Sequence, residues 1–342
     1  ALTDSARIDR LVDDAAAHGI NTLLVQVRGR ADAYYDSSLE PRAESMDRAR
    51  PGFDPLAHLI ARAHARDLDV HAWIAVHLVW GLGPLPRDPR HLVLARPDLL
   101  AVPRAIAAEL HGIDPFDARY LERLRDWTLA QDGRVEGLYT DPGHPEVRAR
   151  VLEVSGELLS RYPLDGLHLD YIRYGSPEFS YSRRSLETFR RELQPQIAPG
   201  LAADLDARAQ RNPLAWAEGL PEEYAAWRER QITDLVRALG RRRDEVRPQA
   251  ALTAAVFADP LDARRGRFQD WPAWLANDWI DVVVPMAYTR DPSRFARLAQ
   301  AAQQADASGG GRGAGAGAGA AESRSGTAER GGASQSRVWM GL

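Results

Sequence analysis

The chain has 342 residues, a formal net charge of −4 and an isoelectric point near 6.2, a mildly acidic balance that gives no reason to expect nucleic acid or an anionic membrane as a partner. The absence of cysteine excludes disulfide bonds and cysteine metal sites, and no apolar run approaches the roughly 20 residues of a membrane span. The length can accommodate one α/β barrel or two ordinary domains.

Strand-like and helix-like patterns alternate along the chain. Gly19 is expected to end the first helix in a left-handed cap, and Asp54 followed by Pro55 is a typical helix start. The apolar spacing predicts helices at 1–18, 53–70, 144–162, 182–193, 221–246, 271–277 and 291–305, strands at 21–29, 70–79, 165–174, 251–257 and 280–288, and a long proline-rich loop at 81–141. Five strands alternating with helices predict a parallel sheet wrapped by helices.

The chain is expected to contain three parts. Residues 1–306 are predicted to form a partial (β/α) barrel that holds the functional site. Residues 307–336 are rich in glycine, alanine and serine and are predicted to be a flexible segment, because such residues bury too little to form a core. Residues 337–342, "RVWMGL", resemble the start of a further strand.

Polar side chains gather at the carboxyl ends of the predicted strands. Because alternate residues of a strand face opposite sides, His168 and Asp170 lie opposite the apolar Leu167 and Leu169. Barrel enzymes have their active sites at this end of the sheet. A carboxylate inside a barrel costs free energy unless it is paired or hydrated, so Asp170 is predicted to be functional. We expect Arg28 to lie beside it and to hold it ionised.

The motifs "GINTLLVQVRGRADAYYDSS", "VHAWIAVH", "TDPGHPEVR", "DGLHLDYIRY" and "VVPMAY" occur here in the order found in glycosyl-hydrolase-like family 10, which the chain resembles over residues 5–300. The resemblance implies a TIM-type (β/α)₈ barrel. It also implies glycoside hydrolysis, possibly of bacterial cell-wall glycans, and a protein that is exported or lipid-anchored.

The resemblance further implies an incomplete barrel. Relatives have a strand before the first helix, so the five predicted strands would be strands two to six. "RVWMGL" would then correspond to the seventh strand, and the eighth would be absent. The sheet is therefore expected to be open.

The predicted site follows from both lines of reasoning. Asp170 is the expected base or nucleophile. The second carboxylate is left open between Asp141 and Asp32, with Glu178 as a weaker candidate, because Tyr171 stands where many relatives have a second aspartate. The expected substrate-binding residues are Gln26, Arg28, Trp73, His77, His168, Arg173, Tyr174, Phe257, Met286 and Tyr288. No metal or other cofactor is expected, and the expected partner is a polysaccharide or oligosaccharide.

Two other functions compete with this prediction. A non-catalytic glycan-binding barrel would keep the aromatic residues and arginines but lack a second carboxylate at the right spacing. A metal hydrolase could use the strand histidines, but His71 and His77 are six residues apart on one strand, roughly 20 Å, which is too far to share a metal.

Overall fold

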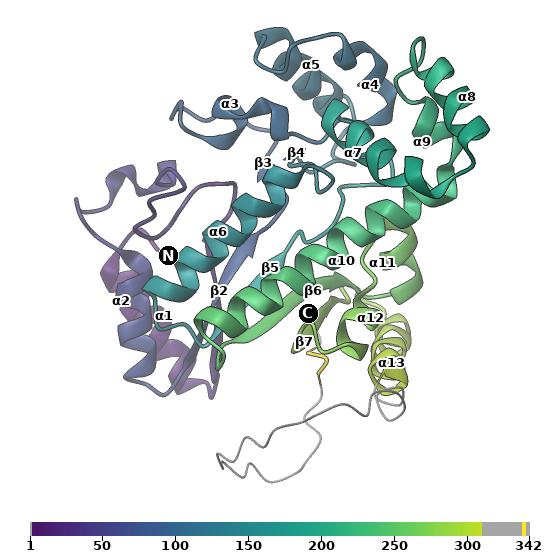
Figure 1. The fold of residues 1–342 in the computed structure, drawn as a ribbon. Helices are drawn as coiled ribbons and strands as arrows, with labels where there is room; N and C mark the ends of the chain where they lie inside the picture. The colour runs from purple at the N-terminus through teal and green to yellow at the C-terminus, as the bar shows by residue number, and fades with distance from the viewer. Residues whose placement is uncertain (1, 310–336, 340–342) are drawn as a thin grey trace.

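A five-stranded parallel sheet forms the centre of the molecule (Figure 1). The computed structural model describes residues 2–309 and 337–339. The strands run in the order β1-β2-β5-β6-β7 and comprise β1 (Thr22–Arg28), β2 (Asp69–Ala75), β5 (Gly166–Asp170), β6 (Ala251–Phe257) and β7 (Val282–Met286). These are the five strands predicted from the sequence, and every neighbouring pair is parallel.

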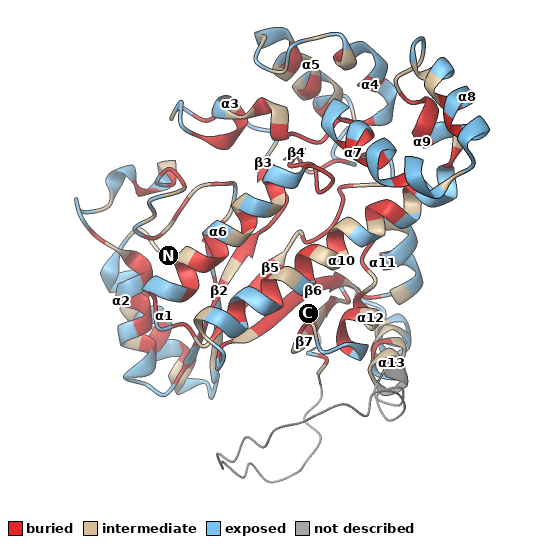
Figure 2. Ribbon diagram, in the orientation of Figure 1, coloured by how far each residue is buried: buried red, intermediate tan, exposed pale blue. Residues whose placement is uncertain are grey.

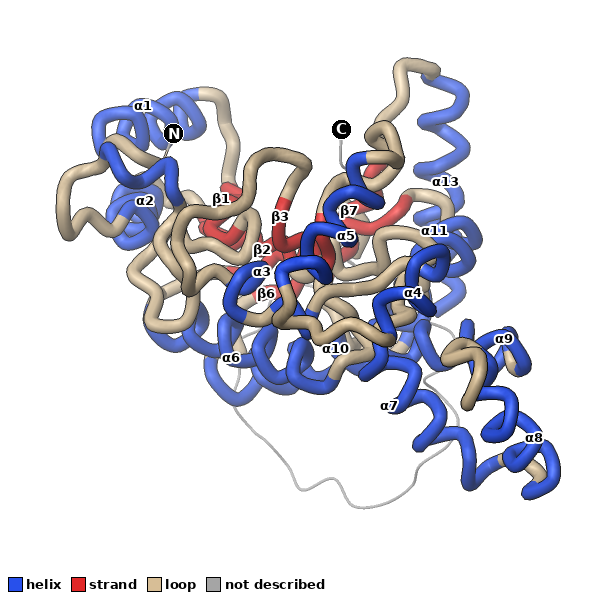
Figure 3. The backbone as a smooth tube through the Cα atoms, turned by 90° about the horizontal axis from the view of Figure 1, so that it is seen from above, coloured by secondary structure: helices blue, strands red, loops and turns tan. Residues whose placement is uncertain are grey.

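Helices cover the convex side of this sheet in an arc that is open between α1 and α13 (Figure 3). The long helices α6 and α10 cross the middle of the sheet, and α1 with α2 lies beside β1. The helices of the arc are α1 (Ser5–Ala17), α2 (Pro55–His64), α6 (Pro145–Arg161), α10 (Pro221–Val246), α11 (Pro260–Arg267), α12 (Trp271–Ala276) and α13 (Pro292–Gly309). This arrangement confirms the predicted parallel sheet with outer helices.

Strands β2, β5 and β6 are mostly buried (Figure 2), and their two faces carry different side chains, as the alternation predicts. Toward the helices, each strand presents buried aliphatic side chains, for example Val70, Ile74 and Leu169. Burial of such a side chain contributes about 1.5–3 kcal/mol. The opposite, concave face carries the bulky and polar residues, including Trp73 and His168. The polar groups of the predicted site therefore look away from the helices.

Local signals explain where the first helices begin and end. The carboxylate of Asp54 accepts a hydrogen bond from the Ala57 amide at 3.0 Å, so the predicted cap of α2 is confirmed. Asp4 caps α1 in the same way. Gly19, just beyond α1, has a φ of +72°, a backbone conformation in which a side chain would be strained.

The region predicted as a loop at 81–141 instead contains three α-helices and a short strand. A two-stranded antiparallel sheet brackets it, with β3 (Leu78–Trp80) just before the region and β4 (Leu138–Tyr139) near its end. Between these strands lie α3 (Leu92–Ala95), α4 (Arg104–His111) and α5 (Ala118–Leu129). Tyr120 and Leu124 of α5 are buried on one helix face, a pattern that the frequent prolines of the region obscured. Two further unpredicted helices, α8 (Pro199–Ala209) and α9 (Ala215–Gly219), follow α7 (Arg183–Leu193).

The sheet does not close into a barrel within the described residues. There β1 pairs with β2 alone among the strands of the sheet, whereas β7 has a partial second neighbour. Val338 forms a parallel bridge to Val283, and the Trp339 amide donates to the Val283 carbonyl at 2.9 Å. Of the predicted flexible segment, residues 310–336 lie outside the described residues. No helix in the described part of the chain is long and apolar enough to cross a membrane.

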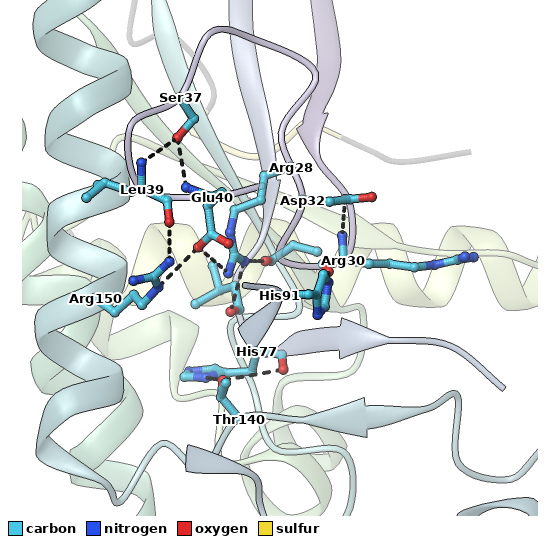
Figure 4. A network of polar contacts seen from close by, with 12 residues as sticks. Arg28, Arg30, Asp32, Ser37, Leu39, Glu40, His77, His91, Thr140 and Arg150 are labelled. Atoms are coloured by element: carbon cyan, nitrogen blue, oxygen red, sulfur yellow. Dashed lines mark hydrogen bonds and ion pairs between the residues drawn. The ribbon is translucent and has the colours of Figure 1, made fainter. Parts of the chain in front are cut away.

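A buried ion pair fixes the long connection between β1 and α2 (Figure 4). Glu40 has a fully buried side chain, and its Oε1 accepts from Arg28 and from Arg150 of α6, both at 3.3 Å. Arg150 also donates to the Leu39 carbonyl. Charges removed from water need such partners, so this carboxylate ties the end of β1 to the helix layer.

Replacing Glu40 with alanine should lower the free energy of unfolding by about 3–5 kcal/mol, because it leaves the Arg28 guanidinium buried without its carboxylate. Urea denaturation of the purified chain measures this loss. The matched control is Glu44→Ala, which removes an exposed pair with Arg87 and should cost at most about 1 kcal/mol. Equal losses for the two variants would contradict a structural role for the buried pair.

Candidate active site

Asp170 is the last residue of β5 and lies at the carboxyl end of the central strands. It is paired with Ala75 of β2 in the sheet register, and the Asp170 carbonyl accepts from the Val76 amide at 2.8 Å. The next residue, Tyr171, turns the chain sharply, with a φ of 51° in the left-handed region. The pairing of β2 with β5 thus holds the Asp170 carboxyl group at the carboxyl ends of β2, β5 and β6. We call this end of the sheet, with the residues that follow these strands, the mouth.

Two donors contact the Asp170 carboxyl group. The Tyr171 amide donates to Oδ1 at 2.7 Å, and the Trp73 indole Nε1 donates to Oδ2 at 3.1 Å. Burial raises the pKa of Asp170 above its usual value, and the donors and the positive charge of Arg173 offset only part of that effect. A carboxyl group with a raised pKa is better suited to donate a proton than an unperturbed one.

The expected pair of Arg28 with Asp170 is not formed. Arg28 Nη2 contacts Glu40, and Nη1 donates to the carbonyl oxygens of Ala75 and Val76. The prediction failed because Glu40 lies in a polar loop with no periodic pattern, and nothing local indicates that this loop folds back to the end of β1. The cation that lies near Asp170 is Arg173, and the pKa of Asp170 is raised rather than lowered.

Arg173 lies among aromatic rings beside Asp170. Its guanidinium carbon is 4.7 Å from the centre of the Tyr171 ring and 5.3 Å from that of Phe257. Arg267 of α11 contacts the same Phe257 ring at 4.9 Å. Aromatic faces and guanidinium groups are both suited to contacts with a sugar, so this cluster is compatible with glycan binding.

The predicted histidines are buried and neutral. His77 is fully buried, its Nδ1 lies 3.1 Å from Thr140 Oγ1, and burial together with the nearby arginines lowers its pKa to about 3. His168 Nδ1 lies 2.8 Å from Thr253 Oγ1, and burial lowers the pKa of this imidazole to about 4. Both imidazole rings are therefore buried below the carboxyl ends of the strands and do not form part of the exposed surface there.

Asp141 is enclosed by the loop that follows β5. Its carboxylate accepts from the Ser180 and Ser182 hydroxyls at 2.5 and 2.6 Å and from the Gly143 amide at 3.0 Å, and none of its surface is exposed. Tyr174, another predicted site residue, is also buried, and its ring packs against Phe268. Both residues hold the loops that surround the mouth.

The remaining predicted residues are spread along the rim. Asp32 is half-buried and accepts from the Arg30 amide of its own turn at 3.0 Å. Gln26 is exposed near the free edge of β1, Met286 is half-buried at the end of β7, and Tyr288 is 72% exposed. The structure therefore brings Asp170, Trp73, Arg173 and Phe257 together, with Tyr288 close enough to Tyr171 to contribute to its raised pKa. It sets Asp32 and Gln26 farther out, in a loop and at the sheet edge.

One carboxylate near Asp170 escaped the sequence analysis. Glu136 precedes β4 and forms an ion pair with Arg173, with 3.0 Å between Oε1 and Nη2. Its negative charge contributes to the raised pKa of Asp170. The only sequence signal was a glutamate inside the short apolar run "VEGLY", in the region that was predicted as a loop.

The described residues contain no group of three or more histidine, aspartate or glutamate side chains placed to hold a metal ion. The strand histidines instead have hydroxyl and aromatic neighbours. His71, for example, packs against Trp339 with 6.0 Å between ring centres.

Comparison with known proteins places this site in a family context. The profile of the family described as Glycosyl hydrolase-like 10 matches residues 2–309. Glycosyl hydrolase YngK of Bacillus subtilis is 29% identical over 164 residues, which cover 47% of this chain and 26% of that protein. Glycosyl hydrolase DigH of Escherichia coli is 31% identical over 168 residues, 48% of this chain and 33% of that protein. The matched regions thus span a third or less of these relatives.

Solved structures with the same fold are glycoside hydrolases. The glycoside hydrolase domain of PgaB (BpsB) from Bordetella bronchiseptica has a TM-score of 0.52 at 15% identity, covering 87% of this chain and 74% of that chain. A β-galactosidase from Bacillus circulans sp. alkalophilus has a TM-score of 0.51 at 15% identity, covering 88% and 40%. These likenesses confirm the predicted TIM-type α/β fold class. From the match over nearly its whole length, the chain belongs to the Glycosyl hydrolase-like 10 family.

Proposed function

We propose that this chain hydrolyses glycosidic bonds of a polysaccharide, with bacterial cell-wall glycan as the substrate class, and that Asp170 is a catalytic carboxyl group. The observation that carries the proposal is the position of Asp170 at the carboxyl end of β5, with a raised pKa and with Trp73 as a hydrogen-bond donor. The family and the bacterial relatives named glycosyl hydrolases support the reaction class. A cell-wall substrate also requires an exported protein, so export is part of the proposal.

In this proposal Asp170 acts as the acid. Glycoside hydrolysis needs one carboxyl group that protonates the leaving oxygen and a second that activates water or attacks the sugar. The base or nucleophile role expected from the sequence depended on Arg28, which pairs with Glu40 instead. Without that cation at its side, and with burial raising its pKa, Asp170 suits proton donation.

The surroundings of Asp170 supply surfaces that a sugar ring needs. Trp73 and Phe257 are half-buried aromatic residues, and Tyr288 is exposed nearby on the rim. Arg267, which is half-buried and contacts the same Phe257 ring, offers guanidinium hydrogen-bond donors. Aromatic faces stack on the apolar faces of sugars, while such donors bind their hydroxyl groups.

A glycan-binding barrel without activity is the second candidate, and the enclosure of Asp141 favours it. The two serine hydroxyls and the amide that surround this carboxylate keep it from a substrate. A pure binding protein would retain oligosaccharides in the same aromatic cluster but release no new reducing ends.

Replacing Asp170 with asparagine should lower kcat/KM by roughly 10²–10⁴-fold, because the variant cannot donate the proton to the leaving oxygen. Reducing-end release from denuded and peptide-bearing peptidoglycan and from other bacterial polysaccharides measures the loss. Oligosaccharide binding and the melting temperature should remain close to those of the wild type. Asp126→Asn, an exposed aspartate on α5, is the matched control. Undiminished turnover by the Asp170 variant would refute the assignment.

The pH profile should carry the signature of Asp170 as an acid. Activity should fall as the pH rises through the raised pKa of this group, because only the protonated form donates. Trp73→Phe removes a hydrogen bond that stabilises the carboxylate, so it should raise this pKa and move the alkaline limb to higher pH. The matched control is Trp216→Phe, which removes an indole–aspartate bond to Asp206 far from the site. An alkaline limb that stays in place with Trp73→Phe would contradict the role of Asp170.

A further inference from the structure

Glu136 has a backbone position that the fold fixes tightly. The next residue, Gly137, packs against the end of β3, where a Cβ atom would lie 1.9 Å from the Trp80 carbonyl oxygen. No side chain fits there without a shift of the backbone, so glycine allows the close approach. The antiparallel pairing of β3 with β4 therefore sets where Glu136 emerges beside the carboxyl end of β5.

The two oxygens of Glu136 are held by two donors. Arg173 Nη2 donates to Oε1 at 3.0 Å, and the Tyr139 hydroxyl donates to Oε2 at 2.6 Å. Partial burial raises the pKa of Glu136, but these donors and the charge of Arg173 outweigh it and hold that pKa below its usual value. The side chain of Glu136 is still 38% exposed, so a substrate can reach it.

Arg173 links Glu136 to Asp170. It follows Asp170 by three residues, contacts the Tyr171 ring, and reaches Glu136 with its guanidinium group. The environments push the two carboxyl groups in opposite directions, because the pKa of Asp170 is raised while that of Glu136 is lowered. Two neighbouring carboxyl groups whose pKa values are driven apart are typical of an acid and its ionised counterpart.

We propose that Glu136 is the second catalytic carboxylate of this site, acting on the attacking water while Asp170 protonates the leaving oxygen. The inference rests on the proposed glycoside hydrolysis and identifies the group that the sequence left open. In this step the water oxygen bonds to the anomeric carbon and Glu136 takes one proton of that water. The bond from the anomeric carbon to the glycosidic oxygen breaks, and that oxygen receives the proton of Asp170. One water is consumed, and a proton returns from Glu136 to Asp170 through solvent.

The other carboxylates near the mouth are less suited to this role. Asp141 is enclosed by hydroxyl and amide donors, and Asp32 bonds to its own turn. Glu40 is fully buried between two arginines. Glu136 combines partial exposure, bound donors and the electrostatic influence on Asp170 described above.

A purely structural role for Glu136, as the counter-ion of Arg173, makes different predictions. If Glu136 only balanced the charge of Arg173, removing its negative charge would still lower activity. A small anion added to the variant would then not attack the anomeric carbon and would form no glycosyl product. The test therefore uses Glu136→Gln, which keeps the shape of the side chain and one oxygen acceptor for Arg173, while its amide group can donate to the Tyr139 hydroxyl. It also uses Glu136→Ala, which opens a space for an anion. Glu109→Ala is the matched control, because it removes an exposed pair with Arg123 on the α4–α5 surface.

Glu136→Gln should lower kcat/KM by roughly 10²–10⁴-fold. It also leaves the buried Arg173 without its carboxylate, so it should lower the melting temperature, and kcat/KM is compared at a temperature where the variant is fully folded. Azide should raise the cleavage rate of Glu136→Ala at least tenfold over the rate of the same variant without azide. The product of this reaction should be a glycosyl azide. In that reaction an azide nitrogen bonds to the anomeric carbon while the leaving oxygen takes the proton of Asp170. Glu109→Ala should behave as the wild type in both assays. Should Glu136→Ala fail to fold, Glu136→Ser serves for the same rescue.

The proposal is overturned if Glu136→Gln retains a third or more of the wild-type kcat/KM. It is also overturned if the folded alanine or serine variant gains no activity and forms no glycosyl azide in the presence of azide. Failure of the underlying function is distinct, because the wild type itself would then cleave none of the glycans tested. An active wild type that is impaired by Asp170→Asn but not by Glu136→Gln would leave the function standing and reject Glu136.

Discussion

The ion pair between Arg173 and Glu136 connects the two parts of the structure that form the mouth. Arg173 comes from the central sheet, just after β5, whereas Glu136 comes from the small β3–β4 sheet above it. The Arg173 side chain is almost completely buried, so its charge needs a carboxylate and aromatic faces close by. Meeting that need brings a carboxylate from a separate sheet to the end of β5.

A layered distribution of charge follows along the concave face of the sheet. Deep in the interior lie neutral histidines, each with a hydroxyl or aromatic neighbour, as His168 and His71 illustrate. At the mouth lie ionisable carboxyl groups and arginines. Burial deep in the sheet excludes charged forms, whereas partial exposure and ion pairs at the mouth allow them. The carboxyl groups suited to acid–base chemistry on this face therefore lie at the carboxyl ends of the strands, where the fold class leads one to expect a site.

The sequence predicted the features that depend on local pattern. Alternation in β5 indicated that Asp170 lies on the inward face of the sheet, and apolar patterns located all five strands. The adjacent Asp54 and Pro55 were enough to locate the cap of α2. Features that depend on distant partners were missed. Ser180 and Ser182 enclose Asp141 from about 40 positions away, and Glu40 reaches Arg28 from within a polar loop. Glu136 was hidden because β4 is only two residues long, too short for periodicity to indicate.

The buried histidines also determine how the fold tolerates acid. Their pKa values in the folded chain lie below the value of 6.5 that they have when exposed, at about 3 for His77 and about 4 for His168. Below pH 6.5 the unfolded chain therefore binds more protons than the folded chain, and stability falls as the pH drops toward those lower values. An enzyme that relies on a protonated Asp170 gains active molecules over part of the same interval. The lowest pH at which such an enzyme works would then be set by the stability of the folded chain rather than by the protonation of Asp170. A neutral replacement for His77 that keeps the contact with Thr140 would extend activity to lower pH.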